Sequence, residues 1–179
     1  LTSADNKTYS TGKKTIPYTK ETLMQVMEDV YYSKEIIIGE EVQGNTADCI
    51  RSSIDLFVKA TDVYPGIIGI DLACYGVDLM KHDDAWWSSY ICDIVDYCSE
   101  GGILTASSHF ANPSGNTQGG ARCRGLLGYD DSMEGYEQAF EDLLTEGTEY
   151  NKLWKEELTT DARFLKALGD NGVTVIWRP

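Results

Sequence analysis

The stretch VTVIWRP, residues 173–179, decides how the rest of the sequence is interpreted. Its β-branched residues are typical of a strand, and it follows a long segment with helical periodicity. A strand placed directly after a helix in this way indicates a β/α unit. Three similar runs stand earlier in the chain: IIIGEEVQG (36–44), GIIGIDLACYG (66–76) and ILTASSHFANPSG (103–115).

Between these runs, apolar residues recur at the spacing of an amphipathic helix. The first helical segment begins with a plausible N-cap at Thr19. Apolar strands that alternate with helices predict a parallel sheet with right-handed crossovers. Residues 1–17 are polar and without periodicity, so we interpret them as a lead-in to one domain over 18–179. Helices are predicted over 18–35, 46–64, 83–102, 132–147 and 151–169.

Two α/β architectures fit this alternation: an open doubly wound sheet, and part of an eight-stranded (β/α)8 barrel of the TIM type. The four units occupy about 145 residues, so eight would need roughly 290, which lies within the usual size of such barrels. In a finished four-stranded sheet, the first and last apolar runs would be exposed edges that invite aggregation. The barrel explains them better, with this chain supplying about its first four strands.

Composition excludes several classes of function. The formal net charge of −14 argues against binding to nucleic acid or to an anionic membrane surface, and no apolar run approaches the ~20 residues that span a bilayer. The five cysteines form no C-x2-C pair and there are only two histidines, so we expect no metal centre. Nucleotide-binding glycine motifs and the G-x-S-x-G elbow are absent, and no cofactor is expected. A neutral polysaccharide or a small molecule is compatible with this composition.

Polar residues gather where the predicted strands end, which is the edge where parallel α/β folds place their functional sites. Together with aromatic residues, these groups match the composition of a sugar-binding cleft. A retaining glycosidase needs two carboxyl groups about 5–5.5 Å apart, and Glu41 and Asp71 are the carboxylates clearly at strand ends. We favour a supporting role for both, because neither has a matched acid partner in the sequence.

The third and fourth runs, within GGILTASSHFANPSG (101–115) and DARFLKALGDNGVTVIWRP (161–179), resemble motifs of glycoside hydrolase family 26, to which many β-mannanases belong. The first two runs are similar to its first and second strands. The resemblance implies an endo-acting, retaining hydrolase of β-1,4-mannosidic linkages on a β/α barrel. In the family, Arg-Pro is ordinarily followed by Leu-His-Glu-Met-Asn-Gly, which places the acid/base glutamate just after Pro179. The nucleophile glutamate belongs to the seventh strand. We therefore expect no catalytic residue within the chain, and no activity from this fragment alone.

The resemblance also suggests residues that bind substrate. His109 matches the third-strand histidine that helps to bind the sugar beside the scissile bond. Arg178 matches the arginine before the acid/base segment, and we expect it to orient a carboxylate or support that loop. We expect Phe110 either to stack on a sugar ring or to pack against the protein, and Asn112 to shape the loop. Two weaker candidates are expected to be more architectural: Asp71 and Tyr75.

The partners implied are β-mannan or a related polysaccharide, and the remaining half of the barrel in the same or another chain. The expected location is extracellular, either secreted or on the cell surface. Some alternatives stay open. The chain could be a non-catalytic carbohydrate-binding module built on Phe110, His109 and Trp177, or belong to a family 26 hydrolase of β-1,3-xylan or mixed-linkage β-glucan. An open-sheet enzyme that uses Asp71 or Glu41 as a general base is a further possibility.

Overall fold

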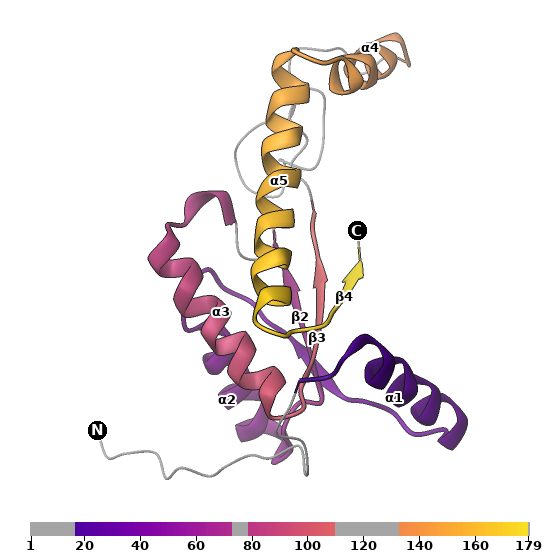
Figure 1. Cartoon of the computed structure of the whole chain (residues 1–179), viewed down its shortest axis with the longest axis vertical. Helices are drawn as coiled ribbons and strands as arrows, with labels where there is room; N and C mark the ends of the chain where they lie inside the picture. The colour runs from indigo at the N-terminus through magenta and orange to yellow at the C-terminus, as the bar shows by residue number, and fades with distance from the viewer. Residues whose placement is uncertain (1–16, 73–78, 110–132, 179) are drawn as a thin grey trace.

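A computed structural model describes residues 17–72, 79–109 and 133–178. It contains one sheet of four parallel strands in the order β1-β2-β3-β4 (Figure 1). The predicted parallel α/β arrangement is therefore confirmed. The strands are β1 (Gly39–Glu41), β2 (Ile67–Asp71), β3 (Ile103–Ser107) and β4 (Val175–Arg178).

Helices occur in all five predicted segments, and their starts follow local capping chemistry. Thr19, Asp83 and Thr148 are N-caps whose side chains each accept a hydrogen bond from a backbone N–H in the first turn. A short 3-10 helix, η1 (Leu79–Lys81), precedes the third α-helix. None of the helices in the described ranges is both long and apolar enough to cross a bilayer. The α-helices are α1 (Lys20–Ser33), α2 (Cys49–Thr61), α3 (Asp84–Ser99), α4 (Met133–Leu144) and α5 (Glu149–Asp170).

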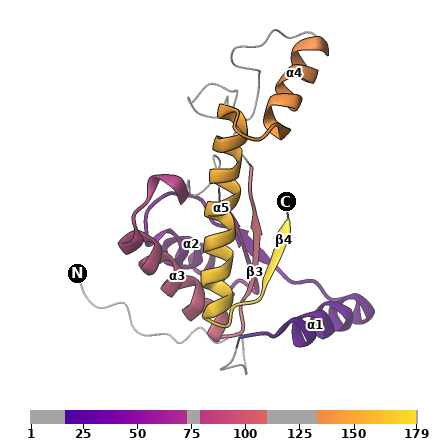
Figure 2. The ribbon, with the colours of Figure 1, turned by 45° about the horizontal axis from the view of Figure 1, so that its top comes forward.

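The core lies between one face of the sheet and the helices α2, α3 and α5, which gather on that side, whereas α1 stands apart (Figures 1 and 2). Ile68 and Ile70 of β2 and Leu104 of β3 are fully buried against this layer. Successive residues of a strand point to opposite faces, so Ile67, Gly69 and Thr105 belong to the other face. The described helices leave that face open, and it lines a pocket.

Two expectations from the sequence are wrong. The first run was predicted to be strand-like from Ile36 onward, but Ile36 is 82% exposed and β1 begins only at Gly39. Within the described residues β1 pairs on one side only, with β2, so residues before the first register pair have no sheet to cover them. In the alternative of a carbohydrate-binding module, Trp177 was expected to lie with His109 at the strand ends. It instead packs against the core, because it alternates with Arg178 along β4.

Candidate functional site

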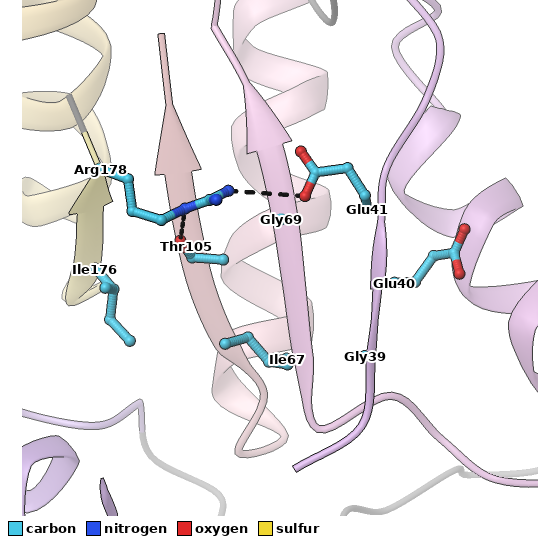
Figure 3. Close-up of a pocket in the computed structure, with 8 residues that line it drawn as sticks. All are labelled: Gly39, Glu40, Glu41, Ile67, Gly69, Thr105, Ile176 and Arg178. Atoms are coloured by element: carbon cyan, nitrogen blue, oxygen red, sulfur yellow. Dashed lines mark hydrogen bonds and ion pairs between the residues drawn. The ribbon is translucent and has the colours of Figure 1, made fainter.

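The open face of the sheet carries a pocket of about 480 Å³ to which every strand contributes (Figure 3). Its floor is formed by small or apolar residues, and charged side chains reach in from β1 and β4. Parallel strands place all these groups on one face of the sheet without any long loop. The lining residues are Gly39, Glu40, Glu41, Ile67, Gly69, Thr105, Ile176 and Arg178.

The side chain of Arg178, on β4, contacts side chains of β3 and β1 on this face. Its Nε donates a hydrogen bond of 2.8 Å to Thr105 Oγ1, and its guanidinium lies 3.7 Å from Glu41 Oε2 (Figure 3). Gly69 makes room for this arrangement, because a Cβ at that position would lie 1.9 Å from Glu41 Oε2. Both charged side chains are about half exposed, so the ion pair adds roughly 0–1 kcal/mol of stability at most. The ion pair therefore orients the two side chains more than it stabilises the fold.

A second polar group lies where β2 and β3 end. Asp71 is 5% exposed, and its Oδ2 accepts a hydrogen bond of 3.2 Å from Ser107 Oγ. The same oxygen bonds Nδ1 of His109, which follows β3. Asp71, Ser107 and Arg178 are register partners across three strands. The structure thus brings three predicted site residues, Asp71, His109 and Arg178, to one edge of the sheet.

Asp161, on α5, belongs to the same region but was not singled out from the sequence. It is 4% exposed, and burial raises the pKa of its carboxyl to about 6. Nearby Ser108 lowers that pKa somewhat, while the charges of Glu157 and Asp71 raise it. In the described part of the chain, neither Ser108 Oγ nor Asp161 Oδ2 has a hydrogen-bond partner of normal geometry. The sequence did contain a signal for the burial of Asp161, since the residue lies three positions before Phe164 and so on the same face of the helix, and Phe164 is buried.

Three other predicted site residues lie outside the described residues: Tyr75, Phe110 and Asn112. Thr105 and Gly69, which the sequence did not single out, are instead the contacts that shape the pocket around Arg178. Their signal was weak, because a single Thr or Gly in an apolar strand has many structural explanations.

The chemistry offered by this edge is hydrogen bonding to a polar ligand. The two strand-end carboxylates already accept contacts from neighbours: Glu41 from Arg178, and Asp71 from Ser107 and His109. Among the described residues, no group of three or more His, Cys, Asp or Glu side chains could hold a metal ion. The guanidinium and the imidazole are suited to hydroxyl-rich ligands.

Similar proteins carry the same fold and point to one family. The chain is 29% identical over 123 residues to the mannan endo-1,4-β-mannosidase A and B of Caldalkalibacillus mannanilyticus, a match that covers 68% of this chain and 21% of that protein. Among solved structures, a Bacillus subtilis mannanase superposes with a TM-score of 0.63 at 22% identity, over 93% of this chain and 48% of that one.

A further structure is the β-mannanase from a symbiotic protist of the termite Reticulitermes speratus, solved with a gluco-manno-oligosaccharide. It gives a TM-score of 0.61 at 19% identity, over 93% of this chain and 51% of that chain. This chain thus spans about half the length of these structures. They are TIM-barrel enzymes, so the four-stranded sheet corresponds to part of a (β/α)8 barrel, as predicted. Residues 14–179 match the family model described as glycosyl hydrolase family 26, and the chain therefore belongs to that family.

Proposed function

We propose that this chain forms the first four strands of a β-mannanase, which hydrolyses β-1,4-mannosidic linkages with retention of configuration. The observation that carries the proposal is the family match over residues 14–179. The preference for mannan is supported by the curated relative, a mannan endo-1,4-β-mannosidase. Retention rests on the resemblance of the strand motifs to the family.

Within this proposal, the edge formed by Asp71, His109 and Arg178 is part of the wall of a sugar-binding cleft. Active sites of β/α barrels lie at the carboxyl ends of the strands, and these residues stand at the ends of β2, β3 and β4. His109 has a largely exposed side chain. It can form a hydrogen bond with a sugar hydroxyl while Asp71 holds its other side.

Both catalytic glutamates, in this proposal, are supplied by parts of the enzyme outside these 179 residues. The contacts of the two strand-end carboxylates support this. A nucleophile must reach the anomeric carbon, whereas Asp71 is 5% exposed and lies beneath His109 and Ser107. Glu41 is turned toward Arg178. Each carboxylate holds a neighbouring side chain in place.

Two assays test the proposal. The 179-residue chain alone, incubated with glucomannan, should release no reducing sugar; release above a heat-treated control would place the catalytic groups inside the chain. The full-length protein that contains this chain should cleave β-mannan faster than β-1,3-xylan and mixed-linkage β-glucan. Proton NMR of early products should show the β-anomer first. Faster cleavage of xylan or glucan, or the α-anomer first, would overturn the substrate or the mechanism.

A further inference from the structure

We propose that Asp71 is a positioning residue that holds the His109 imidazole in its Nδ1–H form, so that Nε2 is the acceptor nitrogen of the neutral ring. The two residues lie at the ends of neighbouring strands. The side chain of Asp71 is 6% exposed, whereas that of His109 is 57% exposed. The contact joins Asp71 Oδ2 to His109 Nδ1. A buried carboxylate thus bonds the inner nitrogen of a ring whose remainder faces outward.

The chemistry of the partner decides which nitrogen carries the proton. An ionised carboxylate can only accept hydrogen bonds, so the ring nitrogen that meets it must donate. In neutral imidazole only one nitrogen carries hydrogen, and the other then offers a lone pair. If the ring is charged, Nδ1 still carries hydrogen. Asp71 therefore favours Nδ1–H in both protonation states and excludes the Nε2–H tautomer.

Asp71 can act in this way because its own position is well determined. It is paired in register with Ser107 of β3, and Ser107 Oγ donates to Asp71 Oδ2 at 3.2 Å. The next residue continues the same alignment, since Leu72 N donates to the Ser107 carbonyl oxygen at 2.9 Å. A carboxylate fixed by its backbone and by a neighbouring hydroxyl gives the imidazole a defined orientation as well as a defined tautomer.

The consequence for recognition rests on the proposed function. A sugar hydroxyl facing Nε2 would donate its hydrogen to that nitrogen, and so the tautomer would determine the direction of the hydrogen bond. Asp71 itself would not contact the sugar, because it lies beneath the ring and beside Ser107. The sequence had suggested Asp71 as a weaker candidate, more architectural than substrate-contacting. An indirect role through His109 agrees with that expectation.

The tautomer can be measured in the full-length protein without any assay of activity. In a protein labelled with ¹⁵N-histidine, the ring signals that disappear in a His109→Gln variant are those of His109. At a pH where the ring is neutral, His109 should show a protonated Nδ1 and an unprotonated Nε2. An Nε2–H tautomer in the unmodified chain would overturn the proposal. Because this result is read from a protein in which Asp71 is unchanged, it does not depend on whether an Asp71 variant folds.

Substitution tests the cause. Asp71→Ala should let His109 move toward the Nε2–H form that free imidazole side chains favour, whereas Ser107→Ala should leave the Nδ1–H form in place. An unchanged tautomer in a folded Asp71→Ala protein would show that another group determines it. Asp71→Asn keeps the volume of the side chain and serves as the second variant if Asp71→Ala does not fold.

A double-mutant cycle in the full-length mannanase separates positioning from direct contact. Asp71→Ala should lower kcat/KM on mannan by about tenfold to a hundredfold, taking as a guide the range found when the carboxylate partner of a metal-bound histidine is removed. In a His109→Ala background the same change should cost less than about twofold, because no ring remains to be held. Additive losses would mean that Asp71 acts on the substrate directly. Absence of mannan cleavage would count against the proposed function, whereas the NMR result would still decide the role of Asp71.

Discussion

The carboxylate of Glu41 and the guanidinium of Arg178 lie 3.7 Å apart, although they belong to the two outer strands of the described sheet. The contact crosses the open face above Gly69 of β2, and Thr105 of β3 supports the arginine from below (Figure 3). Residues far apart in the sequence meet because four strands pair in a fixed register. The space that glycine leaves at position 69 is therefore needed for the contact between Glu41 and Arg178.

Gly69→Ala should displace the Glu41 carboxylate and separate it from Arg178. The new methyl would lie 1.9 Å from Glu41 Oε2, and the end of a flexible side chain can rotate away. We expect the free energy of unfolding to change by less than about 1 kcal/mol, because the pair is half exposed. Urea unfolding gives the stability, and a crystal structure of the variant gives the position of Glu41. A carboxylate that stays in place would contradict the prediction.

Gly39→Ala adds the same methyl group on the neighbouring strand β1, where it would meet backbone instead of a flexible side chain. Its Cβ would lie 2.0 Å from the backbone oxygen of Ile67, which cannot rotate away without disturbing the pairing of β1 with β2. We expect a loss of about 1–3 kcal/mol, the usual cost of overpacking. The same urea titration compares the two variants. If Gly39→Ala were as mild as Gly69→Ala, the approach of β1 to β2 would be looser than the structure has it.

Asp161→Asn should change how stability depends on pH. Burial raises the pKa of Asp161 to about 6 from an ordinary value of 3.8, so between these values the folded state binds more protons than the unfolded state. Ionisation of Asp161 therefore lowers the free energy of unfolding as pH rises through this window, and the effect is constant above it. At pH 7 the variant should be more stable than the unmodified chain by the order of 1–3 kcal/mol, with a smaller difference near pH 4.

Urea unfolding from pH 4 to pH 8 measures this difference. Asp170→Asn, on the exposed end of the same helix, controls for the removal of one negative charge from an acidic chain. A stability difference for Asp161→Asn that does not vary with pH, or that matches the control, would rule out a perturbed carboxyl at this position.

The three described cysteines should differ sharply in reactivity. Cys49 and Cys98 are buried, and burial raises the pKa of their thiols to about 11 and about 12, so almost no thiolate forms at pH 8. Cys92 is exposed. Iodoacetamide at pH 8 should label Cys92 in the folded chain, and Cys49 and Cys98 only after unfolding. Mass spectrometry of peptides reads each site separately. Fast labelling of Cys98 in the folded protein would contradict its burial.

The helices could be predicted because their signals are local. The caps at Thr19 and Asp83, and the spacing of apolar residues, lie within a few residues of each helix start. The first strand was predicted with the wrong extent. Whether Ile36 is buried depends on which segment covers it, and the run IIIGEEVQG carries no information about that neighbour.

The site was predictable to a similar degree. The rule that parallel strands present their carboxyl ends at one edge was enough to bring Asp71, His109 and Arg178 together. It could not say which side chains would touch. The pairing of Arg178 with Glu41 depends on the register and on the space above Gly69. Asp161 reaches the region from α5, a helix packed against β4 and α3, and this relationship is contained only in the tertiary structure.

Arg51→Met should destabilise the contact between α2 and α3. Arg51 lies 2.5 Å from Asp93, which is 5% exposed, and burial raises the pKa of Asp93 while the arginine opposes that shift. Removing the arginine leaves a buried carboxylate without its compensating charge. We expect a loss of about 1–2 kcal/mol at pH 7, below the usual cost for a fully buried pair because Arg51 is mostly exposed.

The loss should shrink as pH falls and Asp93 takes up a proton, since a neutral carboxyl needs no counter-charge. In an Asp93→Asn background, Arg51→Met should cost less than about 0.5 kcal/mol, because nothing charged remains for the arginine to compensate. Urea unfolding of the four proteins of this cycle over a series of pH values from 7 down to 4 supplies the measurement. Equal losses in both backgrounds would mean that Arg51 acts through the packing of its aliphatic stem, or through the exposed Asp96 at 3.7 Å, rather than through Asp93.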